Sequence, residues 1–292
     1  MLHKAGFVNI IGSPNVGKST LMNALVGEKL SIITPKVQTT RHRIMGIVNG
    51  DDYQIVYSDT PGILKPHYKL HESMMQFIHN AFEDADVFLF ITETGENFDD
   101  REILKKLRET QIPVIVLVNK IDLSDQQNVE QMLTGWQKTL PDAEVMPISA
   151  LHRFNLEKVF RVILEKLPES PPFFPKDELT DKTMRFFVSE IIREKIFLNY
   201  RKEIPYSSEV IVDEYKETES IVRIKAYIYV ARESQKGIIL GHQGKAVKKL
   251  GTEARKEIEE FIDQKVFLEL SVKVSGDWRN DEKKLRWFGY EH

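Results

Sequence analysis

The 292-residue sequence contains no cysteine. Disulfide bonds, thiolate metal sites and cysteine nucleophiles are therefore excluded, and a reducing compartment is allowed. No run of about 18 apolar residues occurs, which is the length that a membrane-spanning helix needs. The N-terminal stretch from Met1 to Phe7 has no signal-peptide layout. These absences lead us to expect a cytoplasmic protein.

Strong charge of one sign is also missing, because the formal net charge is only −3. The apolar and charged fractions, 41% and 29%, are those of an ordinary globular protein, and the length predicts about two domains. One stretch departs from this balance: residues 221–256 hold nine Lys or Arg against Glu233 and Glu253 alone. Such a stretch indicates a polyanionic partner, and a solvated charged face is the alternative.

An eight-residue segment near the N-terminus, Gly-Ser-Pro-Asn-Val-Gly-Lys-Ser, fits the phosphate-loop pattern G-x-x-x-x-G-K-[ST]. It follows an apolar stretch, 5–11, that predicts a strand, and it opens a helical pattern that ends at Gly27. Backbone N–H groups and the positive end of a helix together bind oxyanions. A glycine turn without a ligand is the alternative interpretation. The expected phosphate contacts are Gly12, Ser13, Pro14, Asn15, Val16, Gly17, Lys18, Ser19 and Thr20.

The rest of the first half alternates between strand and helix patterns. A turn at 49–52 joins two predicted strands, 43–48 and 53–58. Further strands are predicted at 86–92, 113–118 and 144–148, with helices at 70–82, 101–109 and 155–167. This alternation predicts an α/β domain with a mostly parallel sheet and helices on both faces. Residues 31–43 show no periodicity and form a polar loop long enough to suggest a functional role.

Three polar motifs follow predicted strands: Asp59-Thr60-Pro61-Gly62, Asn119-Lys120-Ile121-Asp122 and Ser149-Ala150-Leu151. Ligands of such sheets bind outside the carboxyl ends of the strands. Asp59 is suited to hold magnesium through a water, and the Gly62 N–H to contact a terminal phosphate. Asp122 can accept two hydrogen bonds from the N1–H and amino group of guanine, a donor pair that adenine lacks. The motifs therefore predict a guanine nucleotide site.

This ordered motif set resembles the signature of the translation-factor-type P-loop GTPases, which hydrolyse GTP to GDP and phosphate. The resemblance implies that Lys18 contacts the β- and γ-phosphates, and that Ser19 and Thr40 ligate Mg²⁺ with support from Asp59. We prefer Thr40 to its neighbour Thr39 as the ligand. By the same resemblance Asn119 and Asp122 fix the guanine, Lys120 lies along its ring and the Ala150 N–H meets its O6. The remaining expected contacts of GTP are Thr60, Pro61, Gly62, Ile63, Ser149 and Leu151.

One position departs from many Ras-like relatives, which place a water-orienting glutamine directly after the D-x-x-G glycine. Here that residue is Ile63, so another group must position the water, and we expect slow intrinsic turnover. The Pro14-Asn15 pair and residues 38–41 resemble the Era branch, in which some members bind potassium through the loop asparagine. That resemblance implies K⁺ at Asn15, although the residue can also simply shape the loop. The expected catalytic residues are Asn15, Lys18, Thr40 and Gly62.

A proline-rich stretch, 167–176, marks the domain boundary and predicts a semi-rigid spacer. We expect a GTPase domain over 1–168, a linker over 169–179 and a second domain over 180–292. The second domain is predicted to contain a helix at 183–200, strands at 208–215, 221–230 and 266–274, and a closing helix at 277–290. The Tyr and Ile stripes of its strands favour a core over a base-stacking platform.

Within the second domain, Gly241-His242-Gln243-Gly244 lies between a short helical piece and a long helix that reaches Ile262. This α+β pattern resembles a type II KH domain, whose G-x-x-G loop clamps about four nucleotides of single-stranded nucleic acid. The lysines after the loop can instead form a solvated face paired with nearby glutamates. The expected RNA contacts are Lys236, Gly237, Ile238, Gly241, His242, Gln243, Gly244, Lys245, Lys248 and Lys249.

A GTPase domain followed by a KH domain resembles the Era branch of bacterial ribosome-assembly GTPases. This implies a monomeric chain that binds the 3′ region of 16S rRNA, acts in assembly of the 30S subunit and presents its KH domain according to the nucleotide state. Two alternatives stay open. One is an RNA-binding module with the nucleotide as a structural ligand, and the other is a GTPase associated peripherally with the cytoplasmic face of the inner membrane. An ATPase is disfavoured by Asp122.

Overall fold

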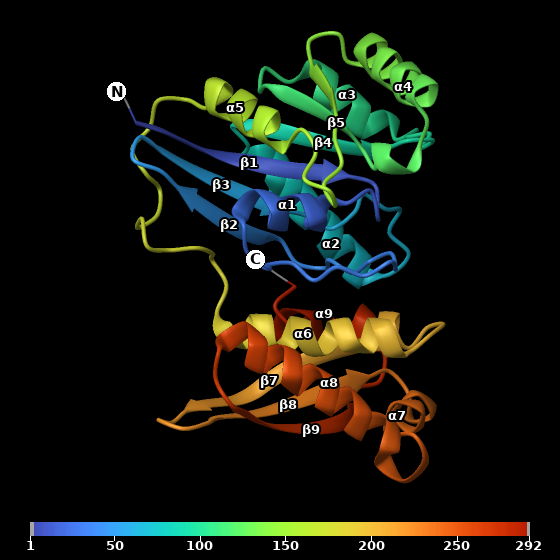
Figure 1. Cartoon of the computed structure of the whole chain (residues 1–292). Helices are drawn as coiled ribbons and strands as arrows, with labels where there is room; N and C mark the ends of the chain where they lie inside the picture. Colours follow the sequence, from blue (N-terminus) through green and yellow to red (C-terminus); the bar gives the residue numbers. More distant parts are fainter. Residues whose placement is uncertain (1–2, 291–292) are drawn as a thin grey trace. The chain divides into compact units, whose positions relative to one another are not determined.

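The computed structural model describes residues 3–290, which fall into two compact units (Figure 1). The first unit comprises residues up to 31 together with 40–65 and 74–181. The second comprises 32–39, 66–73 and the residues from 182 onward. The chain therefore enters the second unit twice for a short segment before it stays there. Both short segments come from stretches next to nucleotide-site motifs.

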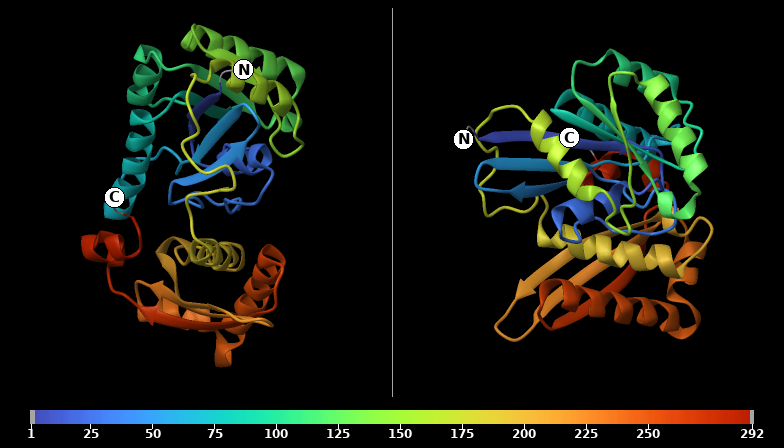
Figure 2. Two further views of the ribbon diagram at one scale, coloured as in Figure 1. Left: turned by 90° about the vertical axis from the view of Figure 1, so that its left-hand side faces the viewer. Right: turned by 45° about the horizontal axis from the view of Figure 1, so that its top comes forward.

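The first unit is built on a six-stranded sheet with the order β2-β3-β1-β4-β5-β6. β2 is antiparallel to β3, and every other neighbouring pair is parallel. Helices lie on both sides of the sheet (Figure 2), which confirms the predicted α/β architecture. The strands are β1 (Lys4–Gly12), β2 (Ile44–Asn49), β3 (Tyr53–Asp59), β4 (Val87–Glu93), β5 (Val114–Asn119) and β6 (Glu144–Pro147).

Hydrophobic burial explains the sequence pattern of these strands. All six residues of β5 are buried, as expected for a strand covered by helices on both faces. Ile63, the residue after the D-x-x-G motif, also belongs to this core, where it packs in a cluster with Ile11 and Ile78. Its side chain is therefore committed to packing.

Five α-helices occur among residues 3–181: α1 (Lys18–Val26), α2 (Lys69–Glu83), α3 (Arg101–Glu109), α4 (Gln126–Thr139) and α5 (Leu156–Lys166). The first residues of α2, 69–73, group with the second unit. The helix α4 was not predicted. Its sequence is polar on balance, but Val129, Met132, Leu133 and Trp136 recur at helical spacing; Trp136 is its one buried residue, and Met132 and Leu133 pack partly buried against the core. Another local signal was its start, where the Asp125 side chain accepts a hydrogen bond from Asn128 N at 2.8 Å.

The proline-rich segment packs against the first unit through its two phenylalanines. Up to residue 181 it groups with the first unit. The Gln54 side chain accepts hydrogen bonds from the backbone N–H groups of Phe173 and Phe174 at 2.7 and 2.9 Å, and donates one to the Phe174 carbonyl at 2.8 Å. The ring of Phe173 lies 5.0 Å from that of Phe7. The prolines keep this segment out of helices and strands, and the buried Gln54 amide binds the backbone groups of Phe173 and Phe174 instead.

The second unit carries a three-stranded sheet in the order β7-β8-β9, with β7 and β8 antiparallel and β8 and β9 parallel. The order of a helix, two strands, a helical pair and a third strand is that of a type II KH domain, as predicted. Its elements are α6 (Met184–Asn199), β7 (Ser208–Glu217), β8 (Val222–Val230), α7 (Glu233–Leu240), α8 (Lys245–Ile262), β9 (Val266–Val274) and α9 (Glu282–Trp287).

One face of β8 is core, because its apolar residues at alternate positions are at most 1% exposed. The closing helix is shorter than predicted, since only Glu282–Trp287 is α-helical. The left-handed backbone of Asp277 (φ 49°) and a short 3₁₀ turn precede it. Trp278 in that turn is fully buried, and its indole N–H donates to the Ser207 carbonyl at 3.0 Å. Over residues 3–290 no helix combines the length and apolarity needed to cross a membrane.

Candidate nucleotide site and nucleic-acid interface

The phosphate loop is held by Asn119, which lies at the carboxyl end of β5. Its Nδ2 donates to the Val16 carbonyl at 2.7 Å, and its Oδ1 accepts from the Ala150 N–H at 2.9 Å. Gly17, which follows Val16 and directly precedes α1, has φ 102°. A Cβ at Gly17 would lie 2.3 Å from Asn119 Nδ2. Three of the predicted motifs thus meet at one amide side chain.

Lys18 points back into its own loop. Its Nζ donates to the carbonyls of Gly12 and Ser13 at 3.1 and 2.7 Å. Burial lowers the pKa of Lys18 from its ordinary value to about 8, against the opposing charges of Asp59 and Glu96. The ammonium group is thus held in a desolvated position, where phosphate oxygens would favour its charged form.

Three oxygen-bearing side chains converge beside this loop. Ser19 Oγ donates to Asp59 Oδ2 at 2.7 Å and lies 2.8 Å from Thr40 Oγ1. Asp59 is fully buried, and its Oδ1 has no hydrogen-bond partner among residues 3–290. Burial raises the pKa of Asp59, whereas the Ser19 hydroxyl and the Lys18 charge lower it. Carboxylate and hydroxyl oxygens suit Mg²⁺, so these residues fit the predicted ion.

Thr39 and Thr40 differ in where their hydroxyls lie. The Thr39 hydroxyl lies 2.6 Å from Thr34 Oγ1 and donates to the Lys36 carbonyl at 2.7 Å. It is therefore engaged within its own loop, while Thr40 faces Ser19. This arrangement supports the preference for Thr40 as the metal ligand.

At the guanine end, Asp122 Oδ1 accepts from Ser149 Oγ at 2.6 Å. His152 Nε2 lies 3.7 Å from Asp122 Oδ2. Lys120 adopts a left-handed conformation with φ 60° and forms an ion pair with Glu93 at the end of β4. The carboxylate predicted to bind guanine is thus held in place by Ser149, from another of the predicted motifs.

The D-x-x-G segment lies directly against the phosphate loop. A Cβ at Gly62 would come within 2.6 Å of Pro14 Cα, which explains why this position is glycine. The next N–H, of Ile63, donates to the Gly12 carbonyl at 3.1 Å. Asn15, on the same loop, has φ 67°. The structure therefore brings Gly62, Asn15 and Lys18 to one loop, and leaves the Ile63 side chain in the core.

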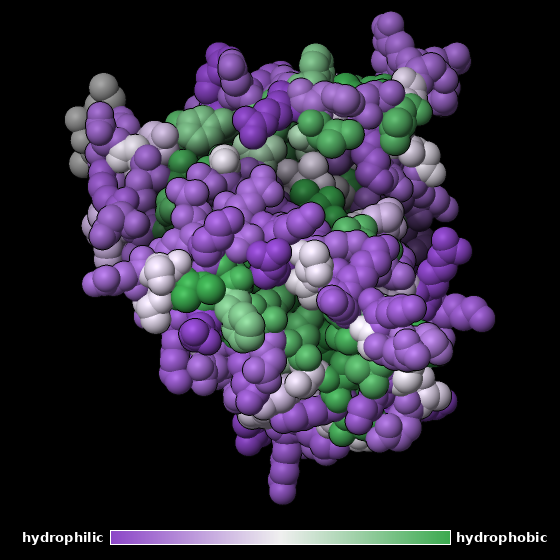
Figure 3. Space-filling view, turned by 60° about the horizontal axis from the view of Figure 1, so that its bottom comes forward, coloured by the Kyte–Doolittle hydropathy of each residue, from purple (hydrophilic) through white to green (hydrophobic). Residues whose placement is uncertain are grey.

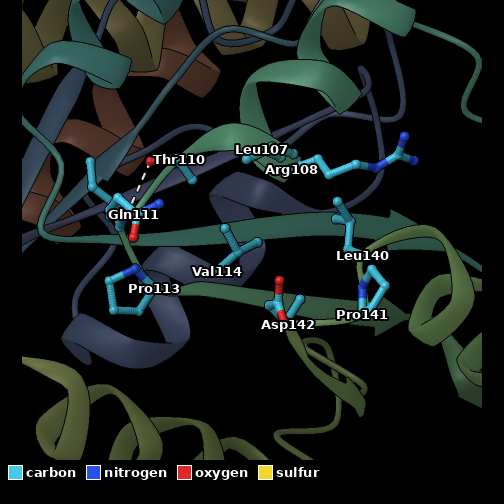
Figure 4. A pocket seen from close by; sticks show the side chains of 11 residues that line it. Leu107, Arg108, Thr110, Gln111, Pro113, Val114, Leu140, Pro141 and Asp142 are labelled. Atoms are coloured by element: carbon cyan, nitrogen blue, oxygen red, sulfur yellow. Dashed lines mark hydrogen bonds between the residues drawn. The ribbon is translucent and has the colours of Figure 1, made fainter.

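A separate hollow of about 270 Å³ lies at the opposite edge of the sheet (Figure 4). It is lined by residues before β5 and β6, among them Arg108, Gln111, Leu140 and Asp142. These residues precede the strands, whereas the nucleotide motifs follow them. The hollow is therefore not part of the predicted site.

The G-x-x-G loop joins α7 to α8 through a tight turn. Gly241 and Gly244 have positive φ values of 67° and 73°, and Gln243 is left-handed with φ 53°. A Cβ at Gly241 would lie 2.6 Å from the Ala246 Cβ. His242 and Gln243 are exposed at the tip. Glycine is thus required by the backbone here, and the two exposed tip residues stand directly before the start of α8.

The lysines that follow the loop are exposed. Lys249 lies 3.6 Å from Glu253, but Lys245 and Lys248 have no ion pair within residues 3–290. Farther along α8, Glu259 pairs with Arg255 of the same helix, whereas Glu257 pairs with Lys195 of α6. The helix is thus partly self-paired beyond the loop, and Lys245 and Lys248, which stand nearest the G-x-x-G turn, are the lysines best placed for a polyanion.

Apolar surface also occurs in the second unit. Ile238, just before the loop, is 50% exposed, and Phe267 on β9 is 51% exposed. Figure 3 shows apolar surface, in green, set among hydrophilic side chains on the face turned to the viewer. Exposed apolar groups together with exposed lysines suit a ligand that combines bases with phosphates.

Comparison with known proteins finds a family match for each of the two parts of the chain. Residues 7–120 match the family described as 50S ribosome-binding GTPase, and residues 203–279 match the KH domain family. "GTPase Era" of Syntrophus aciditrophicus (strain SB) is 45% identical over 294 residues, covering 99% of this chain and 96% of the relative. The chain belongs to the GTPase Era family. It is a GTPase that carries a KH domain.

Other Era proteins are similar over their whole length. That of Clostridium kluyveri (strain ATCC 8527) is 43% identical and covers 99% of both chains. A crystal structure of Era in complex with MgGDPNP and nucleotides 1506–1542 of 16S ribosomal RNA has a TM-score of 0.94 and 41% identity, covering 99% of this chain and 100% of that one. A variant of Aquifex aeolicus Era bound to GDP and AlF4⁻ gives the same values.

Several residues near the sites of this Era-family chain were not foreseen. Glu93 pairs with Lys120, Glu96 acts on the pKa of Lys18, and His152 lies beside Asp122. Each stands outside the motif patterns. Glu93 was accessible in principle, because it directly follows the predicted strand 86–92, as Asn119 directly follows the predicted strand 113–118, and the two observed strands are neighbours. For the other two the sequence holds no comparable signal.

Proposed function

We propose that this Era-family GTPase binds Mg²⁺ and GTP at the carboxyl edge of its large sheet and hydrolyses GTP to GDP and phosphate. The convergence of Ser19, Thr40 and Asp59 beside Lys18 carries this proposal. We further propose that the loop at 241–244 and its lysines bind the 3′ region of 16S rRNA during assembly of the 30S subunit. The similar Era structure that holds MgGDPNP and 16S nucleotides supports both parts.

In this mechanism Lys18 exchanges the loop carbonyls for the β- and γ-phosphate oxygens. Ser19, Thr40 and Asp59 would hold Mg²⁺, which supplies positive charge against the phosphate oxygens. The Gly62 N–H donates to the γ-phosphate. No group among the motif residues is an evident general base, so in-line attack by water depends on positioning, and the intrinsic rate is slow.

Single-turnover GTP hydrolysis with and without RNA tests the enzymatic role. We expect Ser19→Ala to abolish Mg²⁺-dependent hydrolysis, and 16S RNA of nucleotides 1506–1542 to raise the wild-type rate. Hydrolysis that stays negligible in both conditions would favour the alternative, an RNA-binding module with the nucleotide as a structural ligand.

We also propose that Asn15 helps to bind K⁺, whose charge would stabilise the transferring phosphoryl group in place of an arginine finger. The support is its place on the loop that Gly62 contacts. Hydrolysis should then be faster in potassium than in sodium, and Asn15→Ala should remove the difference. Equal wild-type rates in the two salts, or a potassium response that survives in Asn15→Ala, would contradict this role.

We propose that GTP orders the loop 31–43 and the segment after Gly62, and that the nucleotide state thereby changes how the KH domain is presented. Parts of both stretches, 32–39 and 66–73, group with the second unit, which supports such a link. Within that unit the Arg279 guanidinium lies 4.7 Å from the centre of the Tyr68 ring. Equal RNA affinity of the GDP and GDPNP forms would refute the coupling.

We propose that the protein works in the cytoplasm, where ribosomal RNA is found, and that it acts as a monomer. Peripheral association with the inner membrane is the remaining alternative. Flotation of the full chain with liposomes of anionic lipid distinguishes the two, since a cytoplasmic protein stays in the bottom fraction.

A further inference from the structure

The segment 32–39 is bound to the carboxyl end of α6. Lys36 Nζ donates to the carbonyl of Phe197 and, at 2.5 Å, to that of Tyr200. The last carbonyls of a helix have no partner within the helix, and a cation there also interacts favourably with the helix dipole. Lys36 therefore caps α6 from a segment more than 160 positions away in the sequence.

Two further contacts fix the same segment to α6. The Ile33 N–H donates to Glu194 Oε1 at 3.2 Å. Arg193, which is fully buried and paired with Glu190, donates to the Thr39 carbonyl. Thr39 is the last residue of the segment, and the next residue, Thr40, belongs to the first unit. Arg193 therefore binds the carbonyl of the peptide group that joins Thr39 to Thr40, the proposed magnesium ligand.

Tyr200 also reaches the RNA-binding loop. Its hydroxyl donates to the Ile239 carbonyl at 2.9 Å. Ile239 is fully buried in the last turn of α7 and stands two residues before Gly241. Through its carbonyl Tyr200 therefore contacts Lys36, and through its hydroxyl it contacts the helix that leads into the G-x-x-G loop.

We propose that Lys36 is a positioning residue that links Thr40 to the G-x-x-G loop by way of Tyr200. This inference rests on the proposed coupling between nucleotide state and RNA binding, and it names the contact that carries it. Burial and the charge of Arg201 lower the pKa of Lys36, so its charged form is held there at some cost. The bonds to the two carbonyls stabilise this contact, whereas burial and the nearby charge of Arg201 destabilise it. Such a contact can form in one nucleotide state and open in the other.

The test measures the Kd of the full chain for RNA of nucleotides 1506–1542, once with MgGDPNP and once with MgGDP. The ratio of the two values is the coupling between the sites. In Lys36→Met, which keeps the aliphatic length and removes the charge, we expect the ratio to move at least about fivefold toward one. Lys36→Arg should keep the wild-type ratio, because a guanidinium can cap the same carbonyls.

Two further variants separate the link from general effects. Tyr200→Phe removes the hydroxyl bond to Ile239 and should also move the ratio toward one, with no further change when combined with Lys36→Met. Lys158→Met, an exposed lysine on α5, is the matched control and should leave the ratio unchanged. A wild-type ratio that differs from one and persists in Lys36→Met overturns the role of Lys36 alone. A wild-type ratio of one refutes the coupling itself and this inference with it.

Discussion

Raising the pH above 8 should weaken GTP binding, because Lys18 then loses its proton before the ligand arrives. Burial lowers the pKa of this lysine to about 8 in the protein without nucleotide. Phosphate oxygens in place of the Gly12 and Ser13 carbonyls favour the ammonium form, so the pKa rises in the complex. At pH 7 and below the lysine is mostly protonated in both states, so this side chain adds little pH dependence to binding. Above pH 8 binding must take up a proton.

The size of the effect follows from a single titration with this pKa. Affinity should be about tenfold lower at pH 9 than at pH 7, and proton uptake should be about 0.5 per GTP at pH 8 and about 0.9 at pH 9. Isothermal titration calorimetry in two buffers of different ionisation enthalpy measures both quantities. Glu96→Gln should shift the transition to lower pH, since the charge of Glu96 raises the pKa of Lys18.

Lys18→Arg is the matched control, because a guanidinium stays charged over this range. Its affinity for GTP, whatever the absolute value, should not change between pH 7 and 9 through this side chain. The reasoning fails if wild-type protein takes up no proton at pH 9, or if Lys18→Arg loses affinity with pH to the same extent.

Three other outcomes are expected. Asp122→Asn should weaken GTP binding about tenfold to a hundredfold and improve binding of xanthosine triphosphate, which competition binding measures; an unchanged preference for GTP would contradict the guanine role. Gly17→Ala should lower the free energy of unfolding by about 1–3 kcal/mol in urea titrations, because φ is 102°, whereas Gly135→Ala in α4 should not destabilise. Joint Lys245→Gln and Lys248→Gln substitution should reduce RNA affinity and flatten the slope of log affinity against log salt by about 1.4; an unaltered slope would place the phosphates elsewhere.

Local patterns were enough to predict most strands and helices and the motifs at the strand ends, while the KH assignment came from the resemblance of the element order and the G-x-x-G loop to that family. Each of these features is specified by neighbours in the sequence: buried strands by apolar runs such as β5, and the phosphate loop by glycines whose backbone angles no other residue adopts easily. The sequence alone could not decide firmly between Thr39 and Thr40, because both are threonines in one loop and only the contacts of their hydroxyls distinguish them.

The features that sequence reasoning missed depend on partners far along the chain. α4 is an exception, because its apolar residues Val129, Met132, Leu133 and Trp136 stand at helical spacing and Asp125 caps its start, so the local signals for this helix were present. The proline-rich segment follows Gln54, a buried amide more than a hundred residues away. Nothing local in Lys36 distinguishes it from a solvated lysine, because its role depends on where α6 ends. Such contacts are set by tertiary packing, which periodicity does not report.

The two short crossings of the chain, at 32–39 and 66–73, limit how this protein can be taken apart. A fragment that stops before residue 182 keeps every nucleotide motif but leaves segment 32–39 without the helix that binds Lys36, Arg193 included. A fragment that starts at 182 keeps the G-x-x-G loop but leaves the end of α6 uncapped by Lys36. No single cut yields both units whole. Rates and affinities measured on either fragment therefore describe a protein that lacks the contacts between segment 32–39 and α6. GTP hydrolysis and RNA binding are best compared in the intact chain.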